Sequence, residues 1–387
     1  MNNSTILILG NYPPPYGGVP HHIKLFSNHL SNKGNKVFIV AGGNGKNIKK
    51  GNIEVRKSNF FKKIYYLVFS TFKPKFINIL IKNGFKIKNL KYFLRLNIFF
   101  NISESIIRQN KIDIILSYNL YYYSPIAYEL NKIYKIPYIV NVFGEIYKLE
   151  ELMNNKSYYL DILNNSKQNI SCSIHCAKSI DLLTKRNIIP YKSILYGIDM
   201  NIFNAERINY TKKEKIGFFG RIDTEMGVDI FQKIIIKMSD LNIKYLIAGQ
   251  KGNYYQNIED FKLNSDFQIE TYYNVETNKL AALYKECKIV IVPTRGLRTC
   301  SSLATMEAMS CGCVVLGHNI GGIPELIIPE TGILINFEDI EMFVINIKKL
   351  LINQDELNKR ISNSIEYAKN HFSQETMCEN FTKIISL

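Results

Sequence analysis

Short apolar runs that end at or near glycine, separated by stretches with helical periodicity, constrain the fold of this chain more than any other feature. The first run, Ile6-Leu7-Ile8-Leu9, ends at Gly10 and predicts a buried parallel strand. After a loop rich in proline and glycine, apolar residues recur at spacings of three and four and predict a helix: Ile23, Phe26 and Leu30. Further strands are predicted at 37–40, 112–116 and 138–142. Alternating strands and helices predict a parallel sheet that helices cover on both faces.

The same alternation starts again after Asp199. Strands are predicted at 215–220, 245–249, 289–292 and 314–316, and the polar residues 197–214 are expected to form a hinge. The 387 residues suit two domains of about 100–200 residues each. We therefore expect an α/β protein with two doubly wound, Rossmann-like domains, 1–196 and 197–370, and a cleft between them. In such sheets ligands bind at the carboxyl ends of the strands.

The positive charge of the chain is concentrated in its first half. Residues 1–200 contain 28 basic and 10 acidic side chains, whereas residues 201–387 contain 21 and 23. The net charge of +16 therefore favours an anionic partner of the first half, such as nucleic acid, an anionic membrane surface or a phosphorylated substrate. The alternative, compositional drift in an AT-rich genome, predicts the same excess in both halves. A hydrophobic content of 46% excludes a disordered or fibrous chain.

The cysteines and the N-terminus indicate an intracellular protein with reduced thiols. The seven cysteines include no pair of C-x2-C units, so zinc-ribbon spacing is absent and buried thiols are expected. The first residues lack a basic region and an apolar run long enough for a signal peptide, and no stretch reaches the ~18 apolar residues of a membrane span. We expect a cytoplasmic protein that contacts membranes from their inner face.

Residues 55–103 combine basic and aromatic side chains without a single acid. The segment holds 11 Lys or Arg, no Asp or Glu, and interleaved Phe and Tyr side chains. Such a composition suits the interface of an anionic bilayer. The alternative is a set of helices that pack on the sheet and expose solvated lysines. No recognised nucleic-acid-binding module is present, so nucleic acid is not expected as the partner.

Two glycine-rich loops differ in what they indicate. The loop at 42–46 resembles a phosphate-binding P-loop, but Val40 and Asn47 replace the required Gly and Ser or Thr, and no G-x-G-x-x-G follows the first strand. An NAD-dependent enzyme is therefore not expected. Gly17 and Gly18, between the first strand and helix, allow a ligand to approach the backbone at a helix N-terminus, where N–H groups favour anions. A plain tight turn is the equal alternative.

Residues 293–312 form the most informative stretch. A strand ends at Pro293, and Ser301 and Ser302 are expected to cap a helix whose N–H groups are suited to a diphosphate. Glu307 lies about two turns into that helix, where it can accept hydrogen bonds from the vicinal hydroxyls of a ribose. Gly312 ends the helix before the next strand, and Gly321-Gly322-Ile323-Pro324-Glu325 is expected to open another helix.

These stretches together resemble the retaining GT-B glycosyltransferases of glycosyltransferase family 4. The resemblance covers nearly the whole chain and rests on segments that occur in the family's order: Gly17-Gly18-Val19-Pro20-His21-His22, Tyr196-Gly197-Ile198-Asp199, Gly220-Arg221-Ile222, the helix from Leu303 to Gly312, and Gly321 to Glu325. His371-Phe372-Ser373 is similar to the start of the family's last helix, so 371–387 is expected to cross back to the N-terminal domain.

The resemblance implies transfer of a hexose from a UDP- or GDP-sugar, with retention at the anomeric carbon and without a metal or cofactor. It implies that Gly17, Gly18, Arg298, Ser301, Ser302 and Leu303 bind the donor, together with Arg221 and Glu307. Arg221 would stabilise the leaving diphosphate, Glu307 would bind the ribose, and His22 and Glu145 would contact the acceptor. A helix-face histidine is the equal alternative for His22. With residues 55–103 in the acceptor domain, we expect a lipid-linked glycan or glycolipid acceptor, a peripheral position at the inner face of the plasma membrane, and a role in bacterial surface polysaccharide synthesis.

Three positions depart from the family pattern. Met226 stands where the family has Lys, Thr299 where it has the first carboxylate of Glu-x7-Glu, and Phe143 where it has a His. Thr299 therefore counts with Arg221 and Glu307 among the expected catalytic positions, although it is no carboxylate. In one interpretation the enzyme is active, with Arg295 or Arg298 replacing the lost charge and Glu145 engaging a sugar. In the other, the chain is a catalytically weakened binding or scaffold subunit of a glycosyltransferase complex.

Overall fold

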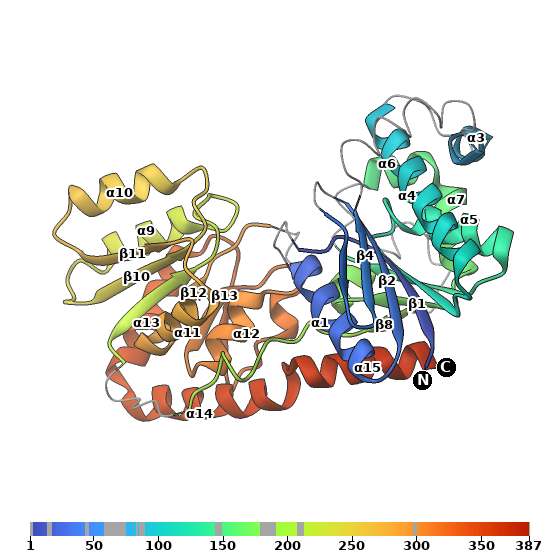
Figure 1. The fold of residues 1–387 in the computed structure, drawn as a ribbon. Helices are drawn as coiled ribbons and strands as arrows, with labels where there is room; N and C mark the ends of the chain where they lie inside the picture. Colours follow the sequence, from blue (N-terminus) through green and yellow to red (C-terminus); the bar gives the residue numbers. More distant parts are fainter. Residues whose placement is uncertain are drawn as a thin grey trace. The chain divides into compact units, whose positions relative to one another are not determined.

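The computed structural model describes most of the chain, and it divides into two compact units. The described residues are 3–13, 18–42, 46–57, 75–82, 84, 90–143, 149–178, 191–206, 213–296 and 300–386. Unit 1 comprises Met1–Ile194 and Cys378–Leu387, and unit 2 comprises Leu195–Met377. Each unit contains its own sheet (Figure 1).

Unit 1 is built on a sheet that has eight strands within the described residues, in the order β3-β4-β2-β1-β5-β6-β7-β8. Every pairing is parallel except that of β3 with β4. The strands are β1 (Thr5–Leu9), β2 (Lys36–Ala41), β3 (Ile48–Lys50), β4 (Ile53–Lys57), β5 (Ile114–Tyr118), β6 (Tyr138–Val142), β7 (Gln168–Ser171) and β8 (Tyr191–Ser193). The helices are α1 (Gly18–Asn32), α3 (Lys75–Lys82), α4 (Leu90–Gln109), α5 (Ser124–Tyr134), α6 (Leu149–Asn154) and α7 (Lys156–Asn164).

The last helix, α15 (Gln374–Ser386), returns the chain to unit 1. The ring of Phe381 lies 4.9 Å from that of His22 and 5.3 Å from that of Phe26, both on α1. The Lys167 ammonium group donates to the carbonyl of Ile385 at 3.4 Å. The core of unit 1 is therefore completed by the end of the chain. His371, predicted to start this helix, instead ends the preceding one.

Unit 2 has a sheet whose pairings are all parallel within the described residues, in the order β11-β10-β9-β12-β13-β14. Its strands are β9 (Lys215–Phe219), β10 (Lys244–Gly249), β11 (Gln268–Tyr273), β12 (Cys287–Val292), β13 (Val314–His318) and β14 (Gly332–Ile335). Its helices are α9 (Val228–Lys237), α10 (Tyr255–Leu263), α11 (Thr277–Glu286), α12 (Leu303–Ser310), α13 (Ile340–Ile352) and α14 (Gln354–His371).

Both faces of the unit 2 sheet are buried, as the alternating apolar runs predict. Ile216 and Phe218 of β9 pack into the core beneath α9 and α13, whereas Phe219 packs into the core beneath α11 and α12. This arrangement confirms the predicted α/β class with a parallel sheet between layers of helices. The helix expected to open at Gly321–Glu325 is a single 3-10 turn, η3 (Ile323–Glu325), which is followed by the buried Leu326.

Candidate functional site

In unit 2, the loops that follow β9 and β12 are bonded to each other at the carboxyl end of the sheet. The backbone N–H of Arg295 and the hydroxyl of Thr294 both donate to the carbonyl of Glu225, at 2.9 and 3.2 Å. Gly227 has a φ of +80°, and a Cβ at this position would lie 2.0 Å from the carbonyl oxygen of Pro293. Only glycine lacks the Cβ atom that would clash with this carbonyl. The two loops therefore pack closely against each other.

Arg221, the residue predicted to neutralise a diphosphate, follows β9 and is paired with two carboxylates. Its Nε donates to Asp223, and its Nη2 donates to Oε2 of Glu225 at 3.1 Å. The hydrogen bond to Asp223 is the main reason why the pKa of Arg221 is raised. The side chain is 48% exposed, so an incoming anion can reach the guanidinium if it replaces these carboxylates.

Arg295 forms ion pairs within the protein, which corrects the expectation that it supplies to a ligand the positive charge missing at Met226. Its Nη1 and Nη2 donate to the two carboxylate oxygens of Asp229 at 2.5 and 2.7 Å, and its Nε donates to Glu338 at 2.7 Å. These two acids raise the pKa of Arg295, with Asp229 contributing most. Met226 itself packs against the apolar core. Among the described residues of these two loops, Arg221 is therefore the cation that an anion can reach.

Helix α12 begins at the predicted cap. The Ser302 hydroxyl accepts from the backbone N–H of Thr305 at 3.2 Å and from its hydroxyl at 2.8 Å. Ser301 is partly buried, and its Oγ atom is inaccessible and has no hydrogen-bond partner among the described residues. Leaving such a group unbonded costs about 1–3 kcal/mol, and the adjacent first turn at Leu303 favours anions through its N–H groups. Arg298 and Thr299, predicted at this site, lie outside the described residues.

Glu307 lies inside α12 and is held by a tyrosine from α11. The Tyr284 hydroxyl donates to Oε2 of Glu307 at 3.0 Å. The ring of Tyr284 is stacked on that of Phe219, at the end of β9, with 3.7 Å between the ring centroids. Burial raises the pKa of Glu307 to about 7, and the hydrogen bond from Tyr284 opposes this shift. Within the described residues, the other carboxylate oxygen, Oε1, accepts no hydrogen bond from the protein.

The opposite end of α12 is capped by a buried lysine, Lys213, which is 4% exposed. Its ammonium group donates to the carbonyls of Cys311 at 2.7 Å, Gly312 at 2.6 Å and Cys287 at 3.1 Å. A cation at this position interacts favourably with the negative end of the helix dipole. Ser302 and Lys213 thus hold the two ends of the helix that carries Glu307.

The comparison of the sequence with known families agrees with this geometry. Residues 200–370, which include every one of these groups, match the family model described as Glycosyl transferases group 1. These residues of unit 2 are therefore similar to that family, and they are called the group 1 domain. At the level of reaction class, the chain therefore groups with the glycosyltransferases.

Whole-chain comparisons extend the likeness beyond the group 1 domain. An uncharacterized glycosyltransferase of Methanocaldococcus jannaschii is 23% identical over 348 residues, which is 86% of this chain and 94% of that protein. Sucrose-phosphate synthase from Thermosynechococcus elongatus superposes with a TM-score of 0.74 at 15% identity, covering 99% of this chain and 98% of that one. HepE of Anabaena in complex with UDP gives 0.72 at 13% identity, covering 99% of both chains. The fold is GT-B, as the sequence predicts.

The residues predicted to contact an acceptor lie in unit 1, outside the group 1 domain. His22 is on the buried face of α1, where its Nε2 lies 3.0 Å from the hydroxyl of Tyr118 and its ring contacts Phe26 at 5.9 Å. Burial, with a smaller contribution from His21, lowers the pKa of His22 to about 3. These contacts support the alternative of a structural histidine. Gly18 begins α1, whereas Gly17 and Glu145 lie outside the described residues.

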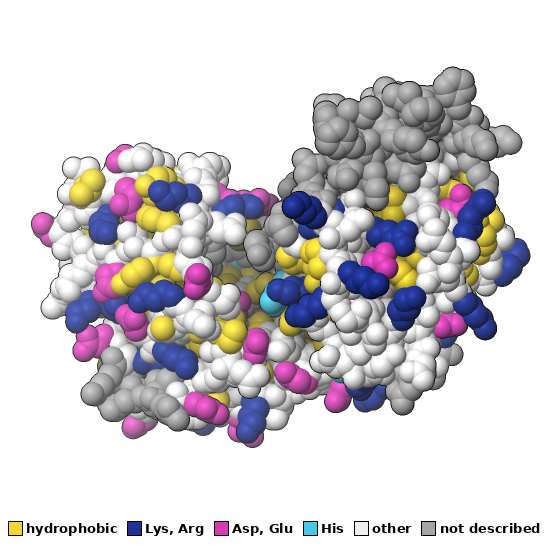
Figure 2. All heavy atoms as spheres, in the orientation of Figure 1, with side chains coloured by type: hydrophobic (Ala, Val, Ile, Leu, Met, Phe, Trp, Pro, Cys, Tyr) yellow, Lys and Arg dark blue, Asp and Glu magenta, His cyan; other side chains and the backbone are white. Residues whose placement is uncertain are grey.

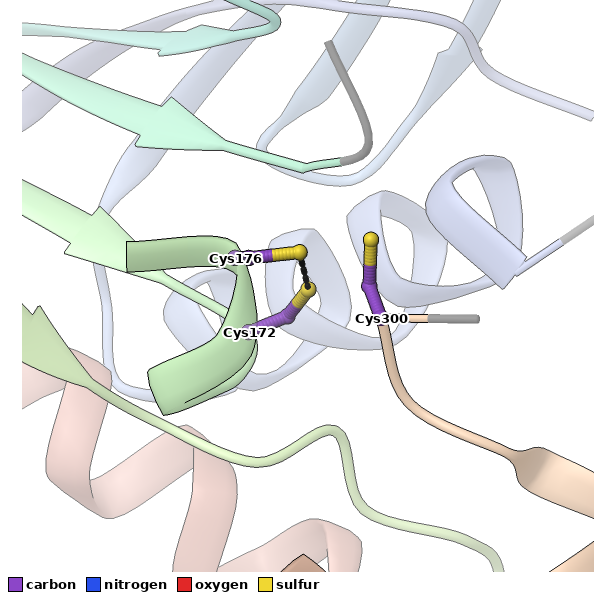
Figure 3. Close-up of side chains that lie close together, drawn as sticks. All are labelled: Cys172, Cys176 and Cys300. Atoms are coloured by element: carbon purple, nitrogen blue, oxygen red, sulfur yellow. Dashed lines mark hydrogen bonds between the residues drawn. The ribbon is translucent and has the colours of Figure 1, made fainter. Parts of the chain in front are cut away.

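The cysteines and Phe143 also lie where packing explains them. Phe143 stacks on Tyr118 with 6.0 Å between the ring centroids. All seven cysteines are thiols, and Cys300 is the one that is partly exposed. After β7, Sγ of Cys172 lies 3.9 Å from Sγ of Cys176 (Figure 3). The expectation of reduced, buried thiols therefore agrees with six of the seven positions.

Much of the basic, aromatic segment 55–103 falls outside the described residues. Within the described part, Phe76, Phe93 and Tyr92 are buried in the core of unit 1, which favours the alternative of helices packed on the sheet. Among the described residues, none of the helices has both the length and the hydropathy that a membrane span requires.

Two residues that the sequence did not single out organise the group 1 domain. Tyr284 positions Glu307 from another helix, and no local pattern marks that pairing. His318, at the end of β13, lies with its Nδ1 2.9 Å from the Thr294 carbonyl, and its Nε2 accepts from the backbone N–H of Glu338 at 3.2 Å. It thereby ties the loops after β12 and β14 together.

Proposed function

We propose that this chain transfers a hexose from a nucleotide diphosphate sugar, UDP- or GDP-linked, to a lipid-linked glycan or glycolipid acceptor in the synthesis of a bacterial surface polysaccharide. The observation that carries the proposal is helix α12, which is preceded by the buried Ser301 hydroxyl, unbonded among the described residues, and carries Glu307 in its second turn. Diphosphate oxygens accept from N–H and hydroxyl groups, and ribose hydroxyls donate to a carboxylate. One helix thus offers complementary groups to both parts of a nucleoside diphosphate.

The charges around α12 are suited to stabilising the leaving group of the donor. Departure of the nucleoside diphosphate builds negative charge on the phosphate next to the sugar, and groups that contact this charge lower the barrier. Arg221 supplies a positive charge, and the first turn of α12 supplies oriented dipoles. Asp223 and Glu225 keep Arg221 fixed while no donor is bound. We propose that the phosphate replaces them, and that the transfer retains the anomeric configuration and needs no metal.

Glu307 binds the ribose in its ionised form in this mechanism. A carboxylate accepts two hydrogen bonds from vicinal hydroxyls, whereas the protonated acid can accept fewer. Tyr284 stabilises the ionised form and fixes the orientation of the carboxyl group. HepE, whose structures contain UDP and UDP-glucose, supports a uridine nucleotide as the first candidate.

Unit 1 is proposed to bind the acceptor at the inner face of the plasma membrane. The excess of basic side chains in residues 1–200 supports an acceptor that carries negative charge, such as a lipid-linked diphosphate. On the face shown in Figure 2, Lys and Arg are prominent on unit 1, whereas unit 2 mixes both signs of charge.

The second candidate is a catalytically weakened subunit that binds a nucleotide sugar without turning it over. The specific observation behind it is the shortage of reachable positive charge: Met226 is uncharged and packs against the apolar core, and Arg295 is bonded to Asp229. Losing one charged contact to the diphosphate costs about 1.5–3 kcal/mol. Such a loss slows a reaction and need not abolish it.

The test compares binding with turnover on the full chain. Calorimetry with UDP and GDP, followed by nucleotide release from a panel of their sugars in the presence of a lipid-linked acceptor, is run on the wild type, Glu307→Gln and Arg221→Gln. Glu366→Gln on α14, an exposed position of the same unit, is the matched control. Release that depends on Glu307 and Arg221 but not on Glu366 supports the enzyme. Binding without release supports the second candidate, and absence of any binding contradicts both.

A further inference from the structure

His318, the last residue of β13, is a fully buried histidine whose two ring nitrogens are both bonded to loops. Its Nδ1 lies 2.9 Å from the carbonyl oxygen of Thr294, in the loop after β12. Its Nε2 lies 3.2 Å from the backbone nitrogen of Glu338, in the loop after β14. A backbone N–H only donates, so Nε2 is the unprotonated nitrogen and Nδ1 carries the proton. Both contacts therefore require neutral His318 in a single tautomer.

The contact to Thr294 continues to the loop that holds Arg221. The hydroxyl of Thr294 and the backbone N–H of Arg295 both donate to the carbonyl of Glu225, at 3.2 and 2.9 Å. The carboxylate of Glu225 accepts from Nη2 of Arg221 at 3.1 Å. A series of hydrogen bonds thus leads from His318 through Thr294 and Glu225 to the half-exposed guanidinium.

The contact to Glu338 reaches the same loops by a second route. Glu338 has a φ of +56°, a left-handed conformation that residues other than glycine seldom adopt. Such a conformation persists where the surrounding contacts hold it. The backbone N–H of Glu338 is bonded to His318, and its carboxylate accepts from Nε of Arg295 at 2.7 Å. His318 therefore holds the backbone of the residue that pairs with Arg295.

The surroundings of the imidazole favour its neutral form. The rings of Phe337 and Phe343 lie 5.4 and 5.3 Å from that of His318, measured between centroids. Burial lowers the pKa of His318, and the hydrogen bond at Nδ1 opposes this shift. The charge of Arg295 lowers the pKa further, whereas that of Glu338 raises it. Because these two charged groups are bonded to each other, neither is free to stabilise a protonated imidazole.

We infer that neutral His318 positions Arg221 for the diphosphate of the donor, by fixing Thr294 and, through it, the main chain of Glu225. The inference deepens the proposed function, on which it rests in taking the ligand of Arg221 to be a diphosphate. His318 is fully buried and does not touch the ligand, so its role is positioning. A guanidinium that is already oriented loses less side-chain freedom when an anion binds, and this increases affinity.

Two substitutions separate the two ring contacts of His318. The amide of His318→Asn can keep the donor to Thr294, whereas the longer amide of His318→Gln can keep the acceptor for Glu338. The Nε–H signal of Arg221 is recorded by NMR on the full chain with isotope-labelled arginine, without ligand, and is assigned by its loss in Arg221→Gln. We expect His318→Asn to retain the wild-type signal and His318→Gln to shift or broaden it. Equal spectra of the two variants would overturn the inference.

A second variant breaks the next hydrogen bond in the series without changing the shape of the side chain. Thr294→Val removes the hydroxyl that donates to Glu225 and leaves the carbonyl that accepts from His318. The variant is expected to fold and to shift the Arg221 signal in the same direction as His318→Gln, by a smaller amount, because the N–H of Arg295 still donates to Glu225. Should His318→Gln not fold, an unchanged Arg221 signal in Thr294→Val would overturn the inference by itself.

UDP affinity, measured by calorimetry on the same samples, tests whether this positioning affects binding. We expect His318→Gln to bind UDP about three- to tenfold more weakly than the wild type. In the Arg221→Gln background, His318→Gln is expected to have no further effect, because it acts through Arg221. Additive losses would contradict the positioning role. Ile347→Val, in the core of unit 2 on α13, is the control that lowers stability and is expected to leave UDP affinity unchanged.

The two readouts separate this inference from the proposed function. If the wild type binds no UDP while its Arg221 signal responds to His318→Gln, the proposed function fails and the link from His318 to Arg221 stands. If the wild type binds UDP and the Arg221 signal is the same in every His318 variant, the inference fails and the proposed function stands.

Discussion

The arginines at the carboxyl ends of the two sheets differ in whether carboxylates surround them. In unit 2, Arg221 faces Asp223 and Glu225, and Arg295 is bonded to Asp229. In unit 1, Arg95 lies between aromatic rings and against Gly42, with no ion pair among the described residues. An anion that enters unit 2 must therefore displace carboxylates, whereas in unit 1 it meets charge that is already exposed.

The difference teaches that two sheets of the same class can offer an anion different electrostatic surroundings. A site whose cations are neutralised by its own acids binds simple phosphate weakly, and it requires further contacts, such as those to Glu307, before binding becomes favourable. An exposed arginine such as Arg95, which makes no ion pair among the described residues, imposes no such requirement. The arrangement in unit 2 therefore suits a ligand with several groups to bind, such as the proposed nucleotide.

The largest expected effect concerns Lys213, a cation of unit 2 that faces carbonyls instead of acids. Lys213→Met leaves the buried carbonyls of Cys311, Gly312 and Cys287 without their donor. We expect a loss of about 2–4 kcal/mol in the free energy of unfolding of unit 2, measured by urea denaturation. The control is Lys348→Met, which removes a surface pair with Asp240 at 2.7 Å and is expected to cost at most about 1 kcal/mol. Equal losses in both variants would show that Lys213 is not a structural cap.

The second prediction is that pH affects the two units in opposite directions. The pKa of His22 is lowered to about 3 in the folded state, so the unfolded chain takes up its proton first and unit 1 loses stability as pH falls below about 6.5. The pKa of Glu307 is raised to about 7, so unit 2 is most stable at low pH and loses stability as pH rises towards 7. Each change should amount to about 2 kcal/mol between pH 5 and 7.

Hydrogen exchange measures how the stability of each unit changes between pH 5 and 7. Peptides from β5 report on unit 1, and peptides from β12 report on unit 2. His22→Gln should flatten the slope of unit 1 alone, and Glu307→Gln that of unit 2 alone. If the stability of both units changed with pH in the same direction in the wild type, the opposite effects assigned to His22 and Glu307 would be refuted. Affinity for UDP should follow the ionised form of Glu307 and therefore rise with pH, against the trend in stability.

The third prediction separates the two arginines of unit 2. Arg221→Gln should weaken UDP binding about tenfold and change stability little, because the side chain is half exposed. Arg295→Gln should reduce stability and leave the affinity of the folded protein unchanged, because its contacts are with Asp229, Glu338 and the backbone. Calorimetry and denaturation on both variants provide the measurements, and a reversed pattern would contradict the assigned roles.

The smallest effect is expected where the family's lysine is restored. Met226→Lys places an additional ammonium group beside the loop of Arg221, and UDP binding should tighten several-fold, by less than the tenfold assigned to a direct contact. Met226→Gln serves as the uncharged control. If Met226→Lys also raises sugar transfer, the natural chain is an enzyme with reduced donor affinity; tighter binding without transfer favours the scaffold alternative.

Local patterns predicted the elements better than the contacts between them. The strand predicted at 138–142 is β6 to the residue, because it follows Pro137 and four of its five residues are β-branched or aromatic. The Ser302 cap was equally predictable, since its partner Thr305 is three residues away. At 321–325, however, glycine and proline predicted a helix start where the structure has one 3-10 turn.

Contacts between residues that are far apart in the chain could not be predicted from the sequence. Arg295 was expected to be available to a ligand, but Asp229, 66 residues earlier, binds it once β9 and β12 become neighbours. Tyr284 reaches Glu307 because α11 packs beside α12, and the partners of Lys213 are backbone carbonyls, which carry no sequence signal at all. Such contacts depend on tertiary packing, which periodicity and spacing do not encode.

The return of the chain through α15 has a consequence for synthesis on the ribosome. Unit 2 is continuous, Leu195–Met377, and can fold as soon as its own residues have emerged. Unit 1 begins first but needs Phe381 against His22 and Phe26, and that residue is made after the whole of unit 2. Unit 1 must therefore wait, with part of α1 uncovered, until translation has passed unit 2. A ribosome stalled shortly after Met377 would carry a finished group 1 domain and an unfinished partner, so the order of folding is the reverse of the order of synthesis.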